Sequence, residues 1–186
     1  MKNIIFTLCL LSIVFTSCKK EVNPFLISKN NIGLLTDSTQ VKDNEAIYAN
    51  DSIVKRIDGD EFTGSINDIK IYDKTGKQLL ILSPNQALDS TATITTIQVV
   101  DPRFKTDKGL NTASTFADIK NNYTISSIQN TLRNVVVFVN EINGFFTIDK
   151  MELPSELRMD VNKKIEAIQI PDNAKIKHFM IGWNQY

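Results

Sequence analysis

The sequence predicts an α+β fold in which two copies of one unit each place a short helix before a four-stranded antiparallel sheet. Two observations lead to this prediction. The heptapeptide GLLTDST at 33–39 returns as GLNTAST at 109–115, with five of seven positions identical. Each copy is followed by an amphipathic stretch and then by four β-rich runs. Such an internal duplication divides the chain into a first unit over 25–101 and a second unit, with a closing strand, over 102–186.

The N-terminus has the pattern of a secretion signal. Lys2 precedes an apolar run from Ile4 to Phe15, and small residues follow, which is typical of a signal peptide over 1–17. Twelve helical residues cover only about 18 Å, which is too short for a hydrocarbon core of about 30 Å. A buried helix or a short anchor is the alternative interpretation.

The sequence FTSC, which ends at Cys18, resembles the lipobox of bacterial lipoproteins, although Phe15 stands where Leu is usual. The SCKK junction is similar to that of lipoproteins from the Bacteroidota. This resemblance implies that Cys18 is lipidated and that 18–24 form the anchored cysteine and a short tether. Acyl chains on the cysteine would attach the protein to a membrane.

The first unit begins with a predicted strand, FLISK at 25–29. Gly33 permits a sharp turn, and the stretch at 40–48 has the apolar spacing of a helix of two to three turns. Ser38 or Thr39 is the expected helix cap, but Lys42 cannot complete a capping box. Four strands are then expected, at 52–57, 66–73, 77–83 and 92–100.

The second unit repeats this order. Thr115 and Asp118 have the spacing of a capping box before a helix at 116–123. The fourth expected strand, IEAIQI at 165–170, matches ITTIQV at 94–99 of the first unit, which supports the duplication. A third short helix or a loop is expected at 154–164. The strands expected in this unit are 123–129, 133–141, 144–150 and 164–170, with a closing strand at 175–183.

This plan resembles the β-lactamase-inhibitor-protein-like envelope modules, a group that includes small outer-membrane assembly lipoproteins and tandem-repeat inhibitor proteins. Their unit enters a helix through a Gly-containing turn and continues into an antiparallel sheet. Members often carry a second Gly where this chain has Thr36 and Thr112. The resemblance implies binding without catalysis, through a sheet face or through loops.

Residue content excludes several kinds of chemistry. His178 is the single histidine, and a mature chain that begins at Cys18 has no free thiol, so the usual zinc ligand sets and thiol nucleophiles are not expected. Neither GxGxxG, GxxxxGK nor GxSxG occurs, and no cofactor is predicted. The 21 basic and 21 acidic side chains balance, which predicts no nucleic-acid binding.

Carboxylates leave two further possibilities open. The segment RIDGDEF at 56–62 is either a polar turn or a loop that holds a calcium ion through oxygen ligands. A pair of acidic residues is the basis of the enzymatic alternative, an envelope hydrolase that uses paired carboxylates.

Five residues are candidates for contact with a partner. Arg103, Phe104 and Lys105 lie in the loop between the two units, where an aromatic anchor is flanked by cations. The alternative is a linker whose Phe104 packs into the core. Phe145 and Trp183 belong to predicted strands, and an exposed aromatic stripe there would mark a binding surface. Packing in the core is the alternative for these aromatic side chains as well.

These observations predict a lipid-anchored, non-enzymatic protein of the cell envelope that binds another envelope component, either a protein, a peptide or a glycan. Lys19 follows the cysteine and only Glu21 is acidic nearby. This pattern favours an outer-membrane anchor that faces the periplasm over export to the surface. A structural spacer and the carboxylate hydrolase are the alternative classes.

Overall fold

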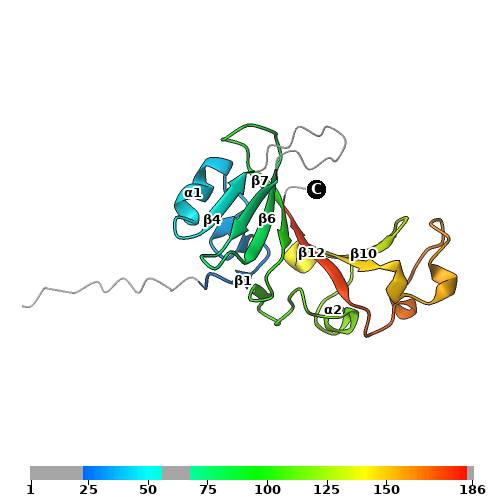
Figure 1. Cartoon of the computed structure of the whole chain (residues 1–186). Coiled ribbons are helices and arrows are strands. Elements are labelled where there is room, and N and C mark those ends of the chain that lie inside the picture. Colours follow the sequence, from blue (N-terminus) through cyan, green and yellow to red (C-terminus); the bar gives the residue numbers. More distant parts are fainter. Residues whose placement is uncertain (1–22, 56–67, 184–186) are drawn as a thin grey trace, which may run out of the picture.

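The computed structural model describes residues 23–55 and 68–183, which form twelve strands in two sheets. The predicted signal peptide, the lipidation at Cys18 and the carboxylate-rich segment 56–62 lie outside the described residues. The predicted α+β class is wrong, because the described chain is mostly β, with one sheet of eight strands and one of four (Figure 1).

The larger sheet is antiparallel and has the order β4-β5-β6-β7-β12-β11-β10-β9. The closing strand β12 therefore lies in the middle and joins β4–β7 to β9–β11, as Figure 1 shows for the red strand between the green and yellow ones. The bounds of its strands are β4 Ser52–Lys55, β5 Ile69–Tyr72, β6 Gln78–Pro84, β7 Ile94–Val99, β9 Ser127–Asn130, β10 Asn134–Val139, β11 Gly144–Asp149 and β12 Ile176–Gly182.

The smaller sheet has two-residue strands in the order β3-β2-β1-β8. Its strands are β1 (Leu26–Ile27), β2 (Asn31–Ile32), β3 (Leu35–Thr36) and β8 (Lys105–Thr106). β1 and β8 are parallel, so the segment that follows the predicted tether pairs directly with the loop between the two predicted units.

Helical structure is short throughout the described residues. α1 (Asn44–Ile47) is one turn that continues the 3-10 turn η2 (Val41–Asp43), and α2 (Phe116–Asn122) has seven residues. Isolated helices shorter than about 12 residues are marginal in water, so these turns depend on packing against the sheet. The amphipathic spacing at 40–48 therefore predicted more α-helix than the single α-helical turn that the structure has there.

The predicted strand at 164–170 is also wrong. Its residues include the 3-10 turn η6 (Ala167–Gln169), and β12 is the strand that pairs with β7. Pro171 follows this turn and has no N–H for a strand ladder. The match between IEAIQI and ITTIQV therefore does not relate two equivalent strands.

Three other 3-10 turns lie near β11 and β12. η3 (Asn140–Ile142) precedes β11, and η4 (Lys150–Glu152) and η5 (Ser155–Leu157) lie in the crossover between β11 and β12.

The two helix entries have a matching arrangement. The Asp118 carboxylate accepts a hydrogen bond from Thr115 N at 2.7 Å, which confirms the predicted capping box. In the first half, Gln40 takes the cap position in place of Ser38 or Thr39, and Asp43 accepts from Gln40 N at 2.9 Å. The prediction of an incomplete box was therefore wrong, because it placed the cap at Ser38 or Thr39 and the structure places it at Gln40.

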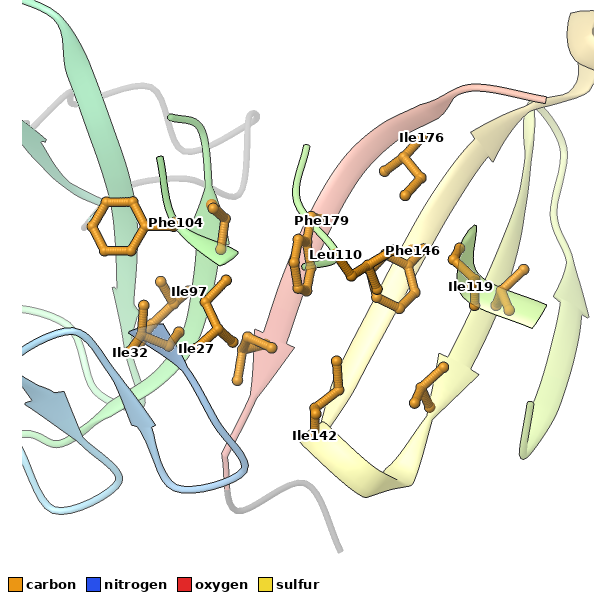
Figure 2. Close-up of a cluster of buried hydrophobic side chains, with 14 of the residues drawn as sticks. Ile27, Ile32, Ile97, Phe104, Leu110, Ile119, Ile142, Phe146, Ile176 and Phe179 are labelled. Carbon is orange, nitrogen blue, oxygen red and sulfur yellow. The ribbon is translucent and has the colours of Figure 1, made fainter. Parts of the chain in front are cut away.

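One hydrophobic core runs under both halves of the large sheet. Figure 2 shows it from Ile32, Ile27 and Phe104, through Phe179, to Phe146 and Ile119. The smaller sheet and α2 contribute to this cluster together with one face of the large sheet. The smaller sheet and α2 therefore cover the same face of the large sheet. Alternate residues of the large sheet point to the opposite, outward face.

Candidate functional site

A pocket of ≈ 310 Å³ lies in the first half of the molecule, between the segment after the predicted tether, the end of α1, the β5–β6 turn and the loop that begins at Asp101. Both apolar and charged side chains form its wall. The lining residues are Pro24, Phe25, Leu34, Tyr48, Asp51, Asp73, Lys74, Thr75, Leu79, Arg103 and Phe104.

Arg103 is held in the pocket wall by two carboxylates. Its Nε donates to Asp101 Oδ1 at 3.0 Å, and its Nη2 donates to Asp101 Oδ2 at 3.0 Å and to Asp73 Oδ2 at 2.7 Å. The Asp101 side chain is fully buried, and Lys77 Nζ lies 3.0 Å from its Oδ2. The guanidinium is therefore fixed through Nε and Nη2, while Nη1 takes no part in these bonds.

These contacts keep both carboxyl groups ionised. Hydrogen bonds from Thr75 and then from Arg103 hold the pKa of Asp73 well below its usual range. Burial alone would raise the pKa of Asp101, but hydrogen bonds from Arg103 and Lys77 outweigh it and lower this pKa to about 2. Hydrogen bonds to Asp101 and Asp73 in turn raise the pKa of Arg103.

Two phenylalanine rings form the apolar wall beside Arg103. Phe25 and Phe104 pack edge to face with their ring centroids 5.1 Å apart, and the Arg103 guanidinium carbon lies 5.1 Å from the Phe25 centroid. Phe104 is only 2% exposed, so it packs in the core, as the linker alternative stated. Gly33 has φ +56°, and a Cβ atom there would lie 2.2 Å from Pro24 O, so this wall requires glycine.

Tyr48 and Asp51 lie at the end of α1 and complete the polar part of the wall. Burial, followed by the charge of Asp51, raises the pKa of the Tyr48 phenol above its usual range. The phenol therefore stays protonated at neutral pH and can donate a hydrogen bond.

Lys105 and Trp183 lie outside this wall. Lys105 is exposed in β8, and its backbone N–H donates to Phe25 O at 2.9 Å. Trp183 is 1% exposed, and its Nε1 donates to Lys29 O at 3.2 Å. Trp183 thus fastens the N-terminal segment to the end of β12 and has no ring surface left for a partner.

Phe145 belongs to a different surface, the outward face of the large sheet. It stacks on Phe138 of β10, with ring centroids 5.8 Å apart, and lies opposite Met180 of β12. Strand pairing places these three residues in a row of directly opposed residues. The row crosses all eight strands of the large sheet, from one edge to the other. The row consists of Val54, Lys70, Ile81, Gln98, Met180, Phe145, Phe138 and Ser127.

His178 lies on the same outward face, beside this row. Its Nδ1 is 3.2 Å from Gln98 Nε2, and the ring is half-buried. Burial, followed by the charge of Lys177, lowers the pKa of His178. A lowered pKa favours the neutral form of the imidazole.

The sequence identified some residues of the pocket and of the outward face, but not the residues that contact them. Arg103 and Phe104 do lie together at the pocket, whereas Phe145 is on the opposite side of the large sheet from the core that contains Phe104. The pocket residues Asp73, Tyr48 and Asp51 were not predicted. Asp73 is 30 residues from Arg103, and no local pattern signals that contact.

Across 23–55 and 68–183, no group of three or more His, Cys, Asp or Glu side chains is arranged to hold a metal ion. In the same residues no helix has the length and apolar character needed to cross a membrane.

Comparison with known proteins supports the fold alone. No family model matches the sequence, and no curated protein matches it. The structure is similar to the crystal structure of the uncharacterized protein yfeY from Escherichia coli, with a TM-score of 0.54 and 16% identity. The similarity covers 84% of this chain and 98% of that one. At this identity the likeness indicates a shared arrangement of the chain and carries no information about activity.

Proposed function

We propose that the protein is a non-enzymatic binding protein of the cell envelope, anchored through Cys18, and that the outward face of its large sheet binds a folded protein partner. The observation that carries this proposal is the row that crosses all eight strands with Phe145 and Phe138 stacked within it. Apolar and aromatic side chains on a sheet face, away from the core, are typical of protein interfaces.

The size of this face suits a protein better than a small ligand. Eight strands at a spacing of about 4.8 Å span roughly 34 Å, and strands of about six residues are roughly 20 Å long. The resulting area of roughly 600–700 Å² is close to the ~800 Å² that one partner contributes to a standard protein interface. Lys70 is the only formally charged side chain in the row, so the part of the partner that contacts the row should also be largely uncharged.

The chemistry of the pocket supports binding over hydrolysis. A glycoside hydrolase needs one carboxylic acid whose raised pKa lets it donate a proton at neutral pH. Asp73 and Asp101 are paired with the same guanidinium, and both have lowered pKa values. Neither member of this pair suits the role of the acid.

A site-specific crosslinking experiment tests the proposal. A photoactivatable amino acid is placed at Phe145 or, as a control, at the exposed Met151 of η4, which lies outside the row. In native envelopes, position 145 should yield a defined adduct that position 151 does not. The captured protein, once purified, should bind the wild-type chain and should lose affinity for a Phe145→Ala variant.

Three outcomes would contradict the proposal: equal adducts at both positions, no adduct at position 145, or unchanged affinity of the Phe145→Ala variant. An adduct with a second copy of this chain, accompanied by dimers in sedimentation experiments, would replace the proposed partner with self-association. The anchor has its own test. Metabolic labelling with a fatty acid should mark the wild-type chain and not a Cys18→Ser variant.

A further inference from the structure

We propose that the pocket formed around Arg103 is a binding site for an uncharged sugar residue, separate from the sheet face to which the protein partner is assigned. The pocket combines an apolar wall, fixed hydrogen-bonding groups and balanced charge. Each of these properties matches one part of a pyranose ring, and together they disfavour the charged alternatives.

Charge balance is the first argument. The wall holds two acidic side chains, Asp51 and Asp73, and two basic ones, Lys74 and Arg103. Directly behind it, the buried Asp101 is paired with Lys77 and Arg103. A ligand that carried one net charge would bring an uncompensated charge into this partly desolvated, neutral set, which is unfavourable. An anion would also have to compete with the two carboxylates that Arg103 already holds.

The arrangement of donors and acceptors is the second argument. Arg103 Nη1 lies outside the pairs that fix the guanidinium, and the protonated Tyr48 phenol is a second donor. Asp51 offers carboxylate oxygens in the same wall. A sugar hydroxyl is both a donor and an acceptor, so neighbouring hydroxyls can bond to a guanidinium and a carboxylate at once.

The apolar wall and the pocket size provide the third argument. Phe25, Leu34 and Leu79 offer surface for the C–H face of a sugar ring, next to the buried Phe104. A volume of ≈ 310 Å³ is at the lower end of the range for small-molecule sites. It therefore accommodates one or two rings of a glycan. Because Asp101 and Asp73 already fix Arg103, little side-chain freedom is lost on binding.

The test uses the full chain in an array of neutral, acidic and basic glycans, followed by NMR titration with each neutral sugar that binds. At least one neutral sugar should bind and shift the resonances of pocket residues. Asp51→Asn and Tyr48→Phe should each weaken its binding about 5- to 10-fold, as expected for the loss of one hydrogen bond. Asp37→Asn, an exposed aspartate away from the pocket, should bind like the wild type.

The proposal is overturned if no neutral glycan binds, if acidic or basic glycans bind more tightly, or if both pocket variants bind like the wild type. Circular dichroism spectra of the variants exclude loss of the fold as the cause of weaker binding. Phe145→Ala should leave sugar binding unchanged, because Phe145 lies on the outward face of the large sheet. Failure of the sugar site and failure of the protein interface can therefore be told apart.

Discussion

Replacing Asp101 by Asn tests how the pocket wall is held together. This change keeps the shape of a fully buried side chain and removes its negative charge. Asp101 Oδ1 accepts hydrogen bonds from Arg103 N at 2.8 Å and Arg103 Nε at 3.0 Å, and Lys77 Nζ lies 3.0 Å from Oδ2. Burial would raise the pKa of Asp101, but these bonds lower it from 3.8 to about 2.

The expected magnitude follows from this pKa. A pKa that is lowered from 3.8 to about 2 on folding corresponds to a stabilisation of the ionised carboxylate by about 2.5 kcal/mol. Solvent screening reduces this to about 2 kcal/mol, because the side chains of Arg103 and Lys77 are 44% and 55% exposed. Since the folded-state pKa lies below the unfolded one, the stabilisation is complete above pH 3.8 and disappears as the pH falls through about 2.

Urea unfolding of the wild type and of Asp101→Asn, from pH 7 down to pH 3, measures this contribution. The variant should be less stable by about 2 kcal/mol at pH 7, and the difference should shrink by about half at pH 3. Asp37→Asn, at an exposed position, should show no comparable change. A difference that is the same at pH 7 and pH 3 would refute the reasoning, because the cost would then come from shape and not from charge.

Other substitutions test separate parts of the structure in the same urea assay. Gly76→Ala should cost about 1 kcal/mol through its positive φ alone, and Gly33→Ala should cost at least about 2 kcal/mol more because its Cβ would also meet a carbonyl oxygen. Equal costs would refute the close contact. Phe146→Ala should cost about 3–5 kcal/mol, because Phe146 is fully buried, whereas Phe145→Ala should cost clearly less. Burial and a neighbouring lysine lower the pKa of His178 below its unfolded value, so the wild type should lose stability relative to His178→Gln as the pH falls from 7.5 to 5.5. A constant difference would contradict that pKa.

The strands could be predicted where β-rich runs are joined by a turn that contains Gly. The β10–β11 hairpin follows from the run of β-branched and aromatic residues after Arg133 and the Gly at 144, and its adjacent Phe145 and Phe146 point to opposite faces, as in any strand. The helix content and the strand at 164–170 were predicted wrongly. Short apolar patterns do not distinguish strands from 3-10 turns, and only packing decided between them.

The candidate site could be predicted only in part. Arg103 stood out because of its neighbours in sequence, but Asp73 reaches it only after β5 and β6 have paired and their turn lies beside the loop at 101–104. Burial of Phe104 and Trp183 likewise depends on the smaller sheet, whose two-residue strands leave no periodic signal. Long-range contacts of this kind are absent from any local pattern.

The central position of β12 has a consequence for how the protein is made. Synthesis delivers the chain from its N-terminus, so the strand that joins β7 to β11 is the last of the described strands to become available. Until residues 176–182 emerge, β7 and β11 both present unpaired edges, which are sites of incorrect pairing with other chains. A chain cut short before Ile176 would retain nearly all of its sequence and still be divided into two incomplete sheets. Correct closure of the large sheet therefore depends on a strand, residues 176–182, that is made after all the strands it joins.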